Sequence, residues 1–321
     1  MFEVRVYEQF IVALMTFLIS FIGTLTNILV LLAIQKPSSM SDSFGIITKN
    51  QAVCNIIMCL IFLIFIVPVQ ISNPKVLISY SHYFGTAALT VYEVSNGSHF
   101  LISLNRFCAV YMPHRYERIF SNSLTLIWRN LLWIISIIFC ILFYEIIDCN
   151  ISYNPSNWTF EFKATEFCAQ LSWYSDFIFN TLVILVTLFF NLITAHKGRK
   201  QSRNLVNSIG SKISKSHRKR EWNFVKQTCF QGLSIFLGQF SYYIIQPVVS
   251  EECPIFLFFI ASLWAFMHAA EGIHRDICDC EEVLSKAGVI KFFLFKKMLF
   301  FKNFLLNKSD NRNNKIIVAI L

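Results

Sequence analysis

The chain has 321 residues, of which 55% are hydrophobic and only 15% are charged, and its mean hydropathy is +0.54. An ordinary soluble domain carries about 45–50% apolar and about 25% charged residues, so this composition excludes that class. The formal net charge of +9 does not indicate a nucleic-acid-binding protein, because the basic residues lie in short segments between apolar runs and form no basic, aromatic-studded surface. Composition therefore indicates a polytopic protein whose partner is the lipid bilayer.

Six long apolar stretches and a shorter seventh follow one another along the chain. Each is close to the roughly 20 residues that a helix needs to cross a hydrocarbon core about 30 Å thick. A spanning segment must satisfy its backbone hydrogen bonds internally, so we expect helices. The predicted spans are residues 10–34, 51–72, 79–105, 125–147, 171–196, 227–249 and 255–273. The predicted fold is an all-α membrane protein, a seven-transmembrane-helix bundle over residues 10–273, with an extracellular N-terminus (1–9) and a basic cytoplasmic tail (274–321).

The distribution of Lys and Arg sets the orientation. With the N-terminus outside, only Arg5, Lys75 and Lys163 of the 28 basic residues fall in outer segments, which leaves 25 on the inner side. Because cytoplasmic loops collect Lys and Arg, we predict an outside N-terminus and a cytoplasmic C-terminus. The inner loop 197–226 contains the densest basic run, from Lys197 to Arg220. We expect it to contact a G protein or anionic lipid headgroups, or to serve topology alone. The basic, Phe-rich segment 291–302 is expected to lie in the membrane interface as an amphipathic helix.

The loop between the fourth and fifth predicted spans has the features of an extracellular segment. Asn150 and Asn157 each begin an Asn-X-Ser/Thr sequon, which accepts a glycan only on the lumenal side. Cys149 and Cys168 lie in the same loop, where the oxidising exterior favours a disulfide, with two free thiols as the alternative. A third sequon, at Asn96, falls inside a predicted span and should stay unmodified.

Ionisable side chains inside the predicted spans are candidates for function, because a charge at that depth is costly unless it is paired or hydrated. Glu93 and His99 lie in the third span, Asp176 in the fifth, and His268 and Glu271 in the seventh. His268 and Glu271 are three residues apart and share a helix face, whereas His99 lies on a different face from Glu93. These side chains contact a polar ligand, form interhelical hydrogen bonds, or are protonated and tolerated. The sequence leaves all three interpretations open.

Aromatic residues gather toward the outer half of the predicted bundle. They suit a small-molecule pocket, although aromatic belts at membrane interfaces have the same composition. They are Tyr83, Tyr92, Trp173, Tyr174, Tyr242 and Tyr243.

Seven spans with an outside N-terminus describe G-protein-coupled receptors, and several motifs in a fixed order narrow that class. These motifs are Ser43-Phe-Gly-Ile-Ile-Thr-Lys-Asn-Gln-Ala52, Leu101-Ile-Ser-Leu-Asn-Arg-Phe-Cys-Ala-Val-Tyr-Met-Pro113, Asp148-Cys149 with Trp158-Thr-Phe160, Glu221-Trp-Asn-Phe-Val-Lys-Gln-Thr-Cys-Phe-Gln231, and Trp264-Ala-Phe-Met-His268 with Glu271-Gly272. Together they resemble the nematode chemoreceptors called serpentine receptor class X, over residues 15–273.

The resemblance implies a chemosensory receptor that binds an external small-molecule or peptide cue and activates a heterotrimeric G protein. It implies a multi-pass glycoprotein of the plasma membrane, in the cilia of sensory neurons, that acts alone or as a homo- or heterodimer. Arg106 stands where rhodopsin-like receptors have the Arg of their Asp-Arg-Tyr motif, so the resemblance assigns Asn105, Arg106 and Phe107 to G-protein coupling. A plain positive-inside anchor is the alternative. Because Asn105 cannot form an ion pair with Arg106, high basal signalling is a further hypothesis.

Pro247, near the outer end of the sixth span, removes a backbone donor and kinks a helix. The resemblance implies a hinge there for an outward swing of the inner end of that helix. A static bend is the alternative.

Other function classes lack their signatures. No nucleophile–base set, glycine-rich phosphate loop or metal-ligand cluster occurs in the sequence, so we predict neither an enzyme nor a cofactor. A transporter often shows two related halves with interrupted helices and a channel shows charge rings or a filter loop; neither is evident, and a ligand-gated channel or transporter stays as an alternative. A degenerate receptor is another, because the seventh span (255–273) is only 19 residues long and the tail after Ile273 departs from the family pattern.

Overall fold

The computed structural model of the chain describes residues 2–34, 42–209, 229, 231–248 and 254–279. The chain divides into two units, Met1–His274 and Arg275–Leu321, and apart from the end of the last helix the elements below belong to the first. Most of the basic loop 197–226, and all of the predicted interfacial helix 291–302, lie outside the described residues.

The apolar runs form helices, several of which include a π-helical stretch, labelled η. The first half of the chain holds α1 (Phe2–Ile34), α2 (Asp42–Ile61), η1 (Phe62–Ile66), α3 (Val67–Ser72), α4 (Lys75–Ser79), α5 (Ser81–Tyr111), α6 (Pro113–Ile119), α7 (Asn122–Cys140) and η2 (Ile141–Ile146). The second half holds α8 (Glu166–Ser172), η3 (Trp173–Ile178), α9 (Phe179–Ile209), helical residues 231–240, η4 (Ser241–Ile245), the 3-10 turn η5 (Gln246–Val248) and α11 (Pro254–Asp279).

Hydropathy alone identifies only part of the predicted bundle. Across the described ranges, four helical stretches are long and apolar enough to cross a membrane: Tyr7–Ile34, Ser43–Ser72, Asn122–Ile146 and Glu166–Gly198. Phe256–Gly272 is a shorter apolar helix. The number of spans and the sides on which the termini lie therefore stay predictions.

α5 covers the third predicted span, which hydropathy does not identify. This helix is 31 residues long, yet it is less apolar than a typical membrane span because polar side chains such as Glu93, Asn96 and Asn105 are spread along it. All three are buried, and α5 contacts α2, α7, α9 and the first β-strand. Its polar groups therefore face protein, which is the arrangement expected of a helix at the centre of a membrane bundle.

α7 presents the opposite pattern. Large aliphatic side chains are exposed along most of its length, among them Ile127, Ile134, Ile135 and Ile138. A continuous apolar face of this kind needs a cover, and lipid chains supply one without any specific partner.

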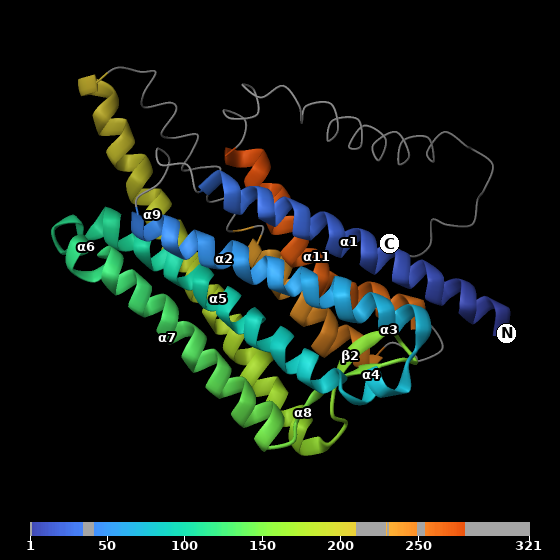
Figure 1. Cartoon of the computed structure of the whole chain (residues 1–321). Helices are drawn as coiled ribbons and strands as arrows, with labels where there is room; N and C mark the ends of the chain where they lie inside the picture. The colour runs from blue at the N-terminus through green and yellow to red at the C-terminus, as the bar shows by residue number, and fades with distance from the viewer. Residues whose placement is uncertain (1, 35–41, 210–228, 230, 249–253, 280–321) are drawn as a thin grey trace, which may run out of the picture. The chain divides into compact units, whose positions relative to one another are not determined.

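A β-hairpin lies between η2 and α8. The chain is therefore mostly helical and not all-α as predicted. Strand β1 (Ile151–Asn154) pairs antiparallel with β2 (Thr159–Phe162), with Ile151 opposite Phe162. In Figure 1 the hairpin lies at one end of the helices, beside α3, α4 and α8. We call this the hairpin end. The start of α1 lies there too, because the Gln9 side-chain amide donates to the Gln70 carbonyl at 2.6 Å. The predicted topology requires the N-terminus and the hairpin to lie on the same side of the membrane.

Three features hold the hairpin against the bundle. A disulfide joins Cys149, just before β1, to Cys168 in α8. The backbone N–H of Tyr153 donates to the Ser81 hydroxyl at 3.0 Å. The third feature is Gly85 on α5, where a Cβ would lie 2.1 Å from the Ile151 carbonyl oxygen. Only glycine allows α5 and β1 to approach this closely.

Candidate ligand-binding site

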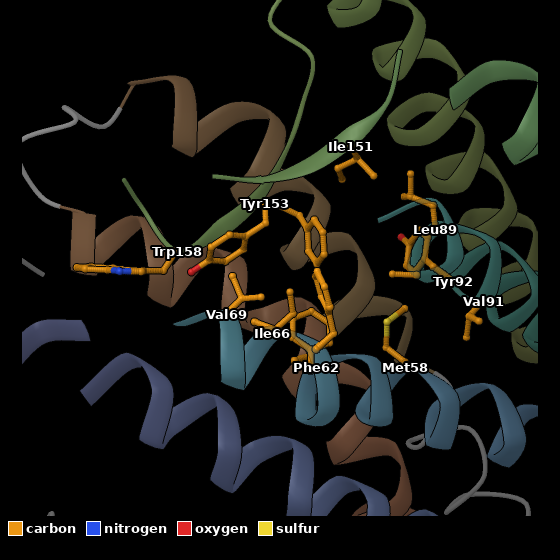
Figure 2. Close-up of a cluster of buried hydrophobic side chains, with 14 of the residues drawn as sticks. Met58, Phe62, Ile66, Val69, Leu89, Val91, Tyr92, Ile151, Tyr153 and Trp158 are labelled. Carbon is orange, nitrogen blue, oxygen red and sulfur yellow. The ribbon is translucent and has the colours of Figure 1, made fainter. Parts of the chain in front are cut away.

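A cavity lies beneath the β-hairpin, within the hairpin-end half of the bundle. Its cavity volume is about 90 Å³, well below the roughly 300–1,000 Å³ of sites for drug-sized ligands, so it suits only a small molecule. Its walls come from α1, η1, α5, both strands, η3, η4 and α11. Figure 2 shows Tyr153 of the hairpin pointing toward Ile66 and Val69, with Leu89 and Tyr92 of α5 across from them. The hairpin therefore forms the roof of the cavity.

Trp264 of α11 organises one wall. Its ring meets those of Phe62, Tyr92 and Phe160 edge-on, with centroids 5.9, 6.0 and 6.3 Å away. Edge-to-face contacts of this kind stabilise aromatic clusters beyond the area they bury. Phe160 in turn packs edge-on against Tyr153, so the wall is continuous with the roof. Burial raises the pKa of the Tyr153 hydroxyl, which therefore stays neutral.

π-helical turns orient several of the side chains that line the cavity. Four such stretches occur in the described part of the chain, and three of them, η1, η3 and η4, line the cavity. A π-turn inserts a residue, rotates the side chains that follow it and is frequent at functional sites. Here it turns Phe62, Asp176 and Tyr243 toward the cavity.

Glu93 and Asp176, which lie on different helices, meet across one amide. The Asn180 side-chain N–H₂ donates to Glu93 Oε1 at 2.8 Å and to Asp176 Oδ1 at 2.9 Å. The Asn180 carbonyl oxygen accepts from the Asn96 amide at 2.9 Å. All four side chains are buried. The structure therefore joins two of the acids that the sequence singles out, and Asn180 is the link.

Asp176 accepts three further hydrogen bonds from two side chains of the sixth helix. The Tyr243 hydroxyl donates to Asp176 Oδ2 at 2.7 Å, and the Gln239 amide donates to Oδ1 at 3.4 Å and to the Asp176 backbone carbonyl at 3.2 Å. Asp176 lines the cavity, whereas Glu93 lies behind it. Asp176 is thus the acid that a bound molecule would meet.

His99 and Glu271 form a separate polar cluster deeper in the bundle. His99 Nε2 lies 3.4 Å from Glu271 Oε2, in an ion pair if the imidazole is protonated. The Gln51 amide nitrogen lies 3.0 Å from each of these atoms and donates to the Ser95 hydroxyl at 2.6 Å. This cluster ties α2, α5 and α11 together. His99 is therefore paired with Glu271 and not with Glu93.

His268 extends these contacts to α1. Its Nδ1 lies 2.8 Å from Asn55 Oδ1, and the Asn55 amide donates to Asn27 Oδ1 at 3.1 Å. Asn27 returns a bond to the His268 carbonyl at 3.1 Å. We call the side chains of Asn27, Gln51, Asn55, Ser95, His99, His268 and Glu271 the inner network. No group of three or more metal-ligating side chains is found in the ranges that the structure describes.

The three residues assigned to G-protein coupling point to different neighbours at the far end of α5. Asn105 is buried, and its amide donates to the Tyr116 hydroxyl of α6 at 3.2 Å. Phe107 stacks on Tyr111 at 4.7 Å between ring centroids. Arg106 is half-buried. Asn105 thus contacts α6, and the role of all three residues in G-protein coupling stays a prediction.

The two outer sequons differ in accessibility. Asn157 is buried, and its amide nitrogen donates to the Glu161 carboxylate. Asn150 is half-buried, and its amide donates to Asp148 at 3.1 Å in an exposed bond. Asn150 is therefore the easier of the two to glycosylate in the folded chain.

The remaining predicted positions divide between cavity and surface. Tyr92, Tyr242 and Tyr243 line the cavity, whereas Tyr83 and Tyr174 are exposed. Trp173 packs edge-on against Tyr243 at 5.9 Å without lining the cavity. Pro247 lies in the 3-10 turn η5, directly after the π-helical η4.

Sequence reasoning missed Asn180 and Gln239, although both contact Asp176. Asn180 stands four residues after Asp176, on the same helix face, and that spacing was a usable signal. Gln239 lies on another helix and carries no comparable signal.

Comparison with known proteins places these features in context. The family model described as "Serpentine type 7TM GPCR chemoreceptor Srx" matches residues 17–274. Serpentine receptor class X 45 of Caenorhabditis elegans is 28% identical over 287 residues, which cover 82% of this chain and 77% of that protein. Serpentine receptor class X-43 of the same organism is 25% identical over 225 residues, which cover 69% of this chain and 68% of that protein. The matched region ends close to the end of the first structural unit.

Proposed function

The chain belongs to the Srx family of serpentine seven-transmembrane chemoreceptors, and on that premise we propose that it is a chemosensory G-protein-coupled receptor. A small external molecule binds in the cavity beneath the hairpin, and the receptor then activates a heterotrimeric G protein. No covalent chemistry is involved.

The observation that carries the proposal is the roofed cavity. Its volume suits a small molecule, and the disulfide between Cys149 and Cys168 ties its roof to α8. A roof of this kind favours a small molecule over a long peptide, because the hairpin covers the space that an extended chain would need. In the predicted topology the hairpin faces the exterior, where the cue arrives.

Contact between the cavity and the inner network supports a route for the signal. Tyr92 and Met267 line both the cavity and a smaller one beside the inner network. The Tyr92 ring meets that of His268 edge-on, with centroids 6.4 Å apart. A ligand that shifts Tyr92 would therefore act directly on side chains that join α1, α2, α5 and α11.

The far end of α5 is the proposed G-protein contact. Arg106 lies there. Lys197 and Lys200 of α9, which belong to the described part of the basic loop 197–226, lie at the same end of the bundle. A cationic surface at this end suits both a G protein and anionic headgroups. The proposed location is the plasma membrane of sensory neurons, in their cilia, where an external cue is available.

The test is ligand-dependent signalling in a cell that lacks other responses to the cue. The receptor is expressed with a reporter G protein, exposed to a panel of small volatile and water-soluble molecules, and assayed for nucleotide exchange on Gα. We expect exchange that rises with at least one compound and is lost in Arg106→Ala, while the surface level of the variant stays unchanged. The wild type should also show basal exchange above that of Arg106→Ala.

The alternatives give different results. A current evoked without any G protein would identify a channel. Retention inside the cell without glycan maturation, together with silence to the whole panel, would identify a degenerate chain.

A further inference from the structure

The cavity beneath the hairpin can carry charge of one sign only. Asp176 is the sole carboxyl group among its described lining residues, which include no Lys, Arg or His. Glu93 adds a second carboxyl group directly behind Asp176, across the shared Asn180 amide. Within the described part of the chain, neither acid forms an ion pair. Two acids thus stand together without a cation from the described residues.

Neutral donors hold Asp176 in place without balancing its charge. They are the Asn180 amide, the Gln239 amide and the Tyr243 hydroxyl. A carboxylate offers about four lone-pair sites, and these three bonds leave one free. A buried carboxylate is strongly stabilised by a nearby positive charge, because the low dielectric of the interior strengthens the attraction. A cationic group of a ligand in the cavity would supply that positive charge.

Unused hydrogen-bond acceptors point the same way. Gln239 Oε1 and Gln70 Oε1 have no partner, although both side chains are more than nine-tenths buried and line the cavity. In each glutamine the amide nitrogen is the atom already engaged, with Asp176 and with the Trp158 carbonyl respectively. The free atoms are therefore the oxygens, and N–H or O–H groups of a ligand, or of a water that it displaces, would satisfy them.

The aliphatic hydroxyls of the cavity, by contrast, already donate to protein acceptors. Thr16 donates to the Val12 carbonyl at 3.0 Å, Thr159 to Asn157 at 2.9 Å and Ser262 to the Phe259 carbonyl at 2.8 Å. Among the hydroxyls, only those of Tyr92, Tyr153 and Tyr242 can still act as donors, and each of these can accept as well. The cavity thus offers a ligand donor one carboxyl group and two free amide oxygens. The indole N–H groups of Trp158 and Trp264, which also line it, are donors, and they leave room for one acceptor on the ligand body.

Aromatic rings surround the acid. Tyr243 and Tyr242 pack edge-on at 4.9 Å between centroids, and the edge-on pair of Tyr92 and Trp264 also lines the cavity. The faces of such rings attract cations within about 6 Å, most strongly where water is excluded. The apolar remainder of the cavity, around Phe62 and Phe160, suits a hydrocarbon or aromatic body.

We propose that the ligand is a small protonated amine on an apolar body, with its N–H groups on Asp176 and Gln239 and its body against Trp264 and Phe160. This inference rests on the proposed function, since it specifies the cue that the cavity receives.

Matched sets of small molecules test it. Purified receptor in nanodiscs with a G protein is exposed to a broad set of arylalkyl- and alkylamines such as phenethylamine, to the matching alcohols such as phenethyl alcohol, and to the matching carboxylates such as phenylacetate. Ligand-dependent nucleotide exchange and thermal stabilisation are both measured. We expect members of the amine set to act at least about 30-fold more potently than their alcohols, which is the scale for a buried charge pair, and the carboxylates to be inactive.

Two variants locate the effect. Asp176→Asn keeps a polar group of similar size and should lower amine potency by at least about 30-fold while leaving the weak alcohol response within about threefold. Glu145→Gln is the matched control. That side chain bonds His82 at 3.1 Å and Thr86 at 2.6 Å and does not line the cavity, so its removal should leave amine potency unchanged.

The outcomes separate the inference from the proposed function. If alcohols or carboxylates activate the wild type as well as amines do, the receptor function stands and the amine assignment is wrong. Equal amine potency in Asp176→Asn and wild type also overturns it. Silence toward all three sets overturns it as well, and loss of basal exchange in the same sample would extend that failure to the receptor function. The comparison among ligand sets uses the wild type, so it holds even if Asp176→Asn fails to fold.

Discussion

The roof of the cavity depends on one glycine, and replacing it gives a sharp prediction. In Gly85→Ala the new Cβ would lie 2.1 Å from the Ile151 carbonyl oxygen and 2.6 Å from Ile151 Cγ2. Ordinary contacts begin near 3.4 Å, so the start of β1 must retreat by the difference between 2.1 and 3.4 Å, about 1.3 Å. The disulfide at Cys149 and the Tyr153–Ser81 bond oppose that movement. The substitution should therefore strain the roof.

Overpacking of this kind costs about 1–3 kcal/mol. We expect Gly85→Ala to unfold at a lower temperature than wild type and to bind ligand more weakly, because the hairpin no longer closes the cavity. The assay is thermal unfolding of purified receptor with and without an activating compound, together with the concentration dependence of nucleotide exchange.

Gly45→Ala is the matched control, because a Cβ at Gly45 in α2 meets nothing within 4 Å. That variant should be as stable as wild type or more stable by up to about 1 kcal/mol, since alanine favours helix. If Gly85→Ala matched Gly45→Ala in both unfolding temperature and ligand potency, α5 and β1 would not approach each other as closely as described here.

Two further predictions concern cross-links between elements. Loss of the disulfide should lower stability by about 3 kcal/mol, as expected for a loop of this length, and by the same amount in Cys149→Ser, Cys168→Ser and the double variant. Thermal unfolding measures the loss. A double variant that is clearly less stable than either single variant would contradict a bond between the two cysteines. A double-mutant cycle of His99→Gln and Glu271→Gln should give a coupling energy of about 0.5–3 kcal/mol, because the two side chains lie 3.4 Å apart. Strict additivity of the two single changes in unfolding free energy would refute that contact.

The helices were predictable because bilayer thickness fixes their length and lipid fixes their composition. The family was predictable too, from motifs such as Leu101–Pro113 and Trp264–His268, and the match over residues 17–274 confirms it. The predicted span 79–105 falls on α5, which is a helix as expected. Its polar side chains leave it outside the helices that hydropathy identifies as long and apolar enough to cross a membrane, so its role as a span stays a prediction.

The hairpin was missed although its sequence contained a signal. In β1 and β2 residues that face the cavity alternate with polar ones: Ile151 and Tyr153 flank Ser152, and Phe160 and Phe162 flank Glu161. This period of two is typical of a half-buried strand. The prediction of an all-α chain left no place for a strand in the loop between two spans.

The pairing of the polar side chains could not be read from one sequence. Asn180 joins Glu93 across 87 positions, and Gln51 joins Glu271 across 220. Helix periodicity says which residues share a face, but the partner helix and its rotation are set by packing in three dimensions. The sequence therefore predicts which side chains need partners and leaves the choice of partner open.

The most direct test of the account is the side of the membrane that the C-terminus occupies. An epitope after Leu321 is probed in intact and in permeabilised cells that display an N-terminal tag at their surface. The account predicts that the C-terminal epitope is detected only after permeabilisation, because an odd number of spans places the two ends on opposite sides. Detection of both tags on intact cells would mean an even number of spans, and it would contradict a seven-helix receptor whose cavity opens to the exterior and whose inner end meets a G protein.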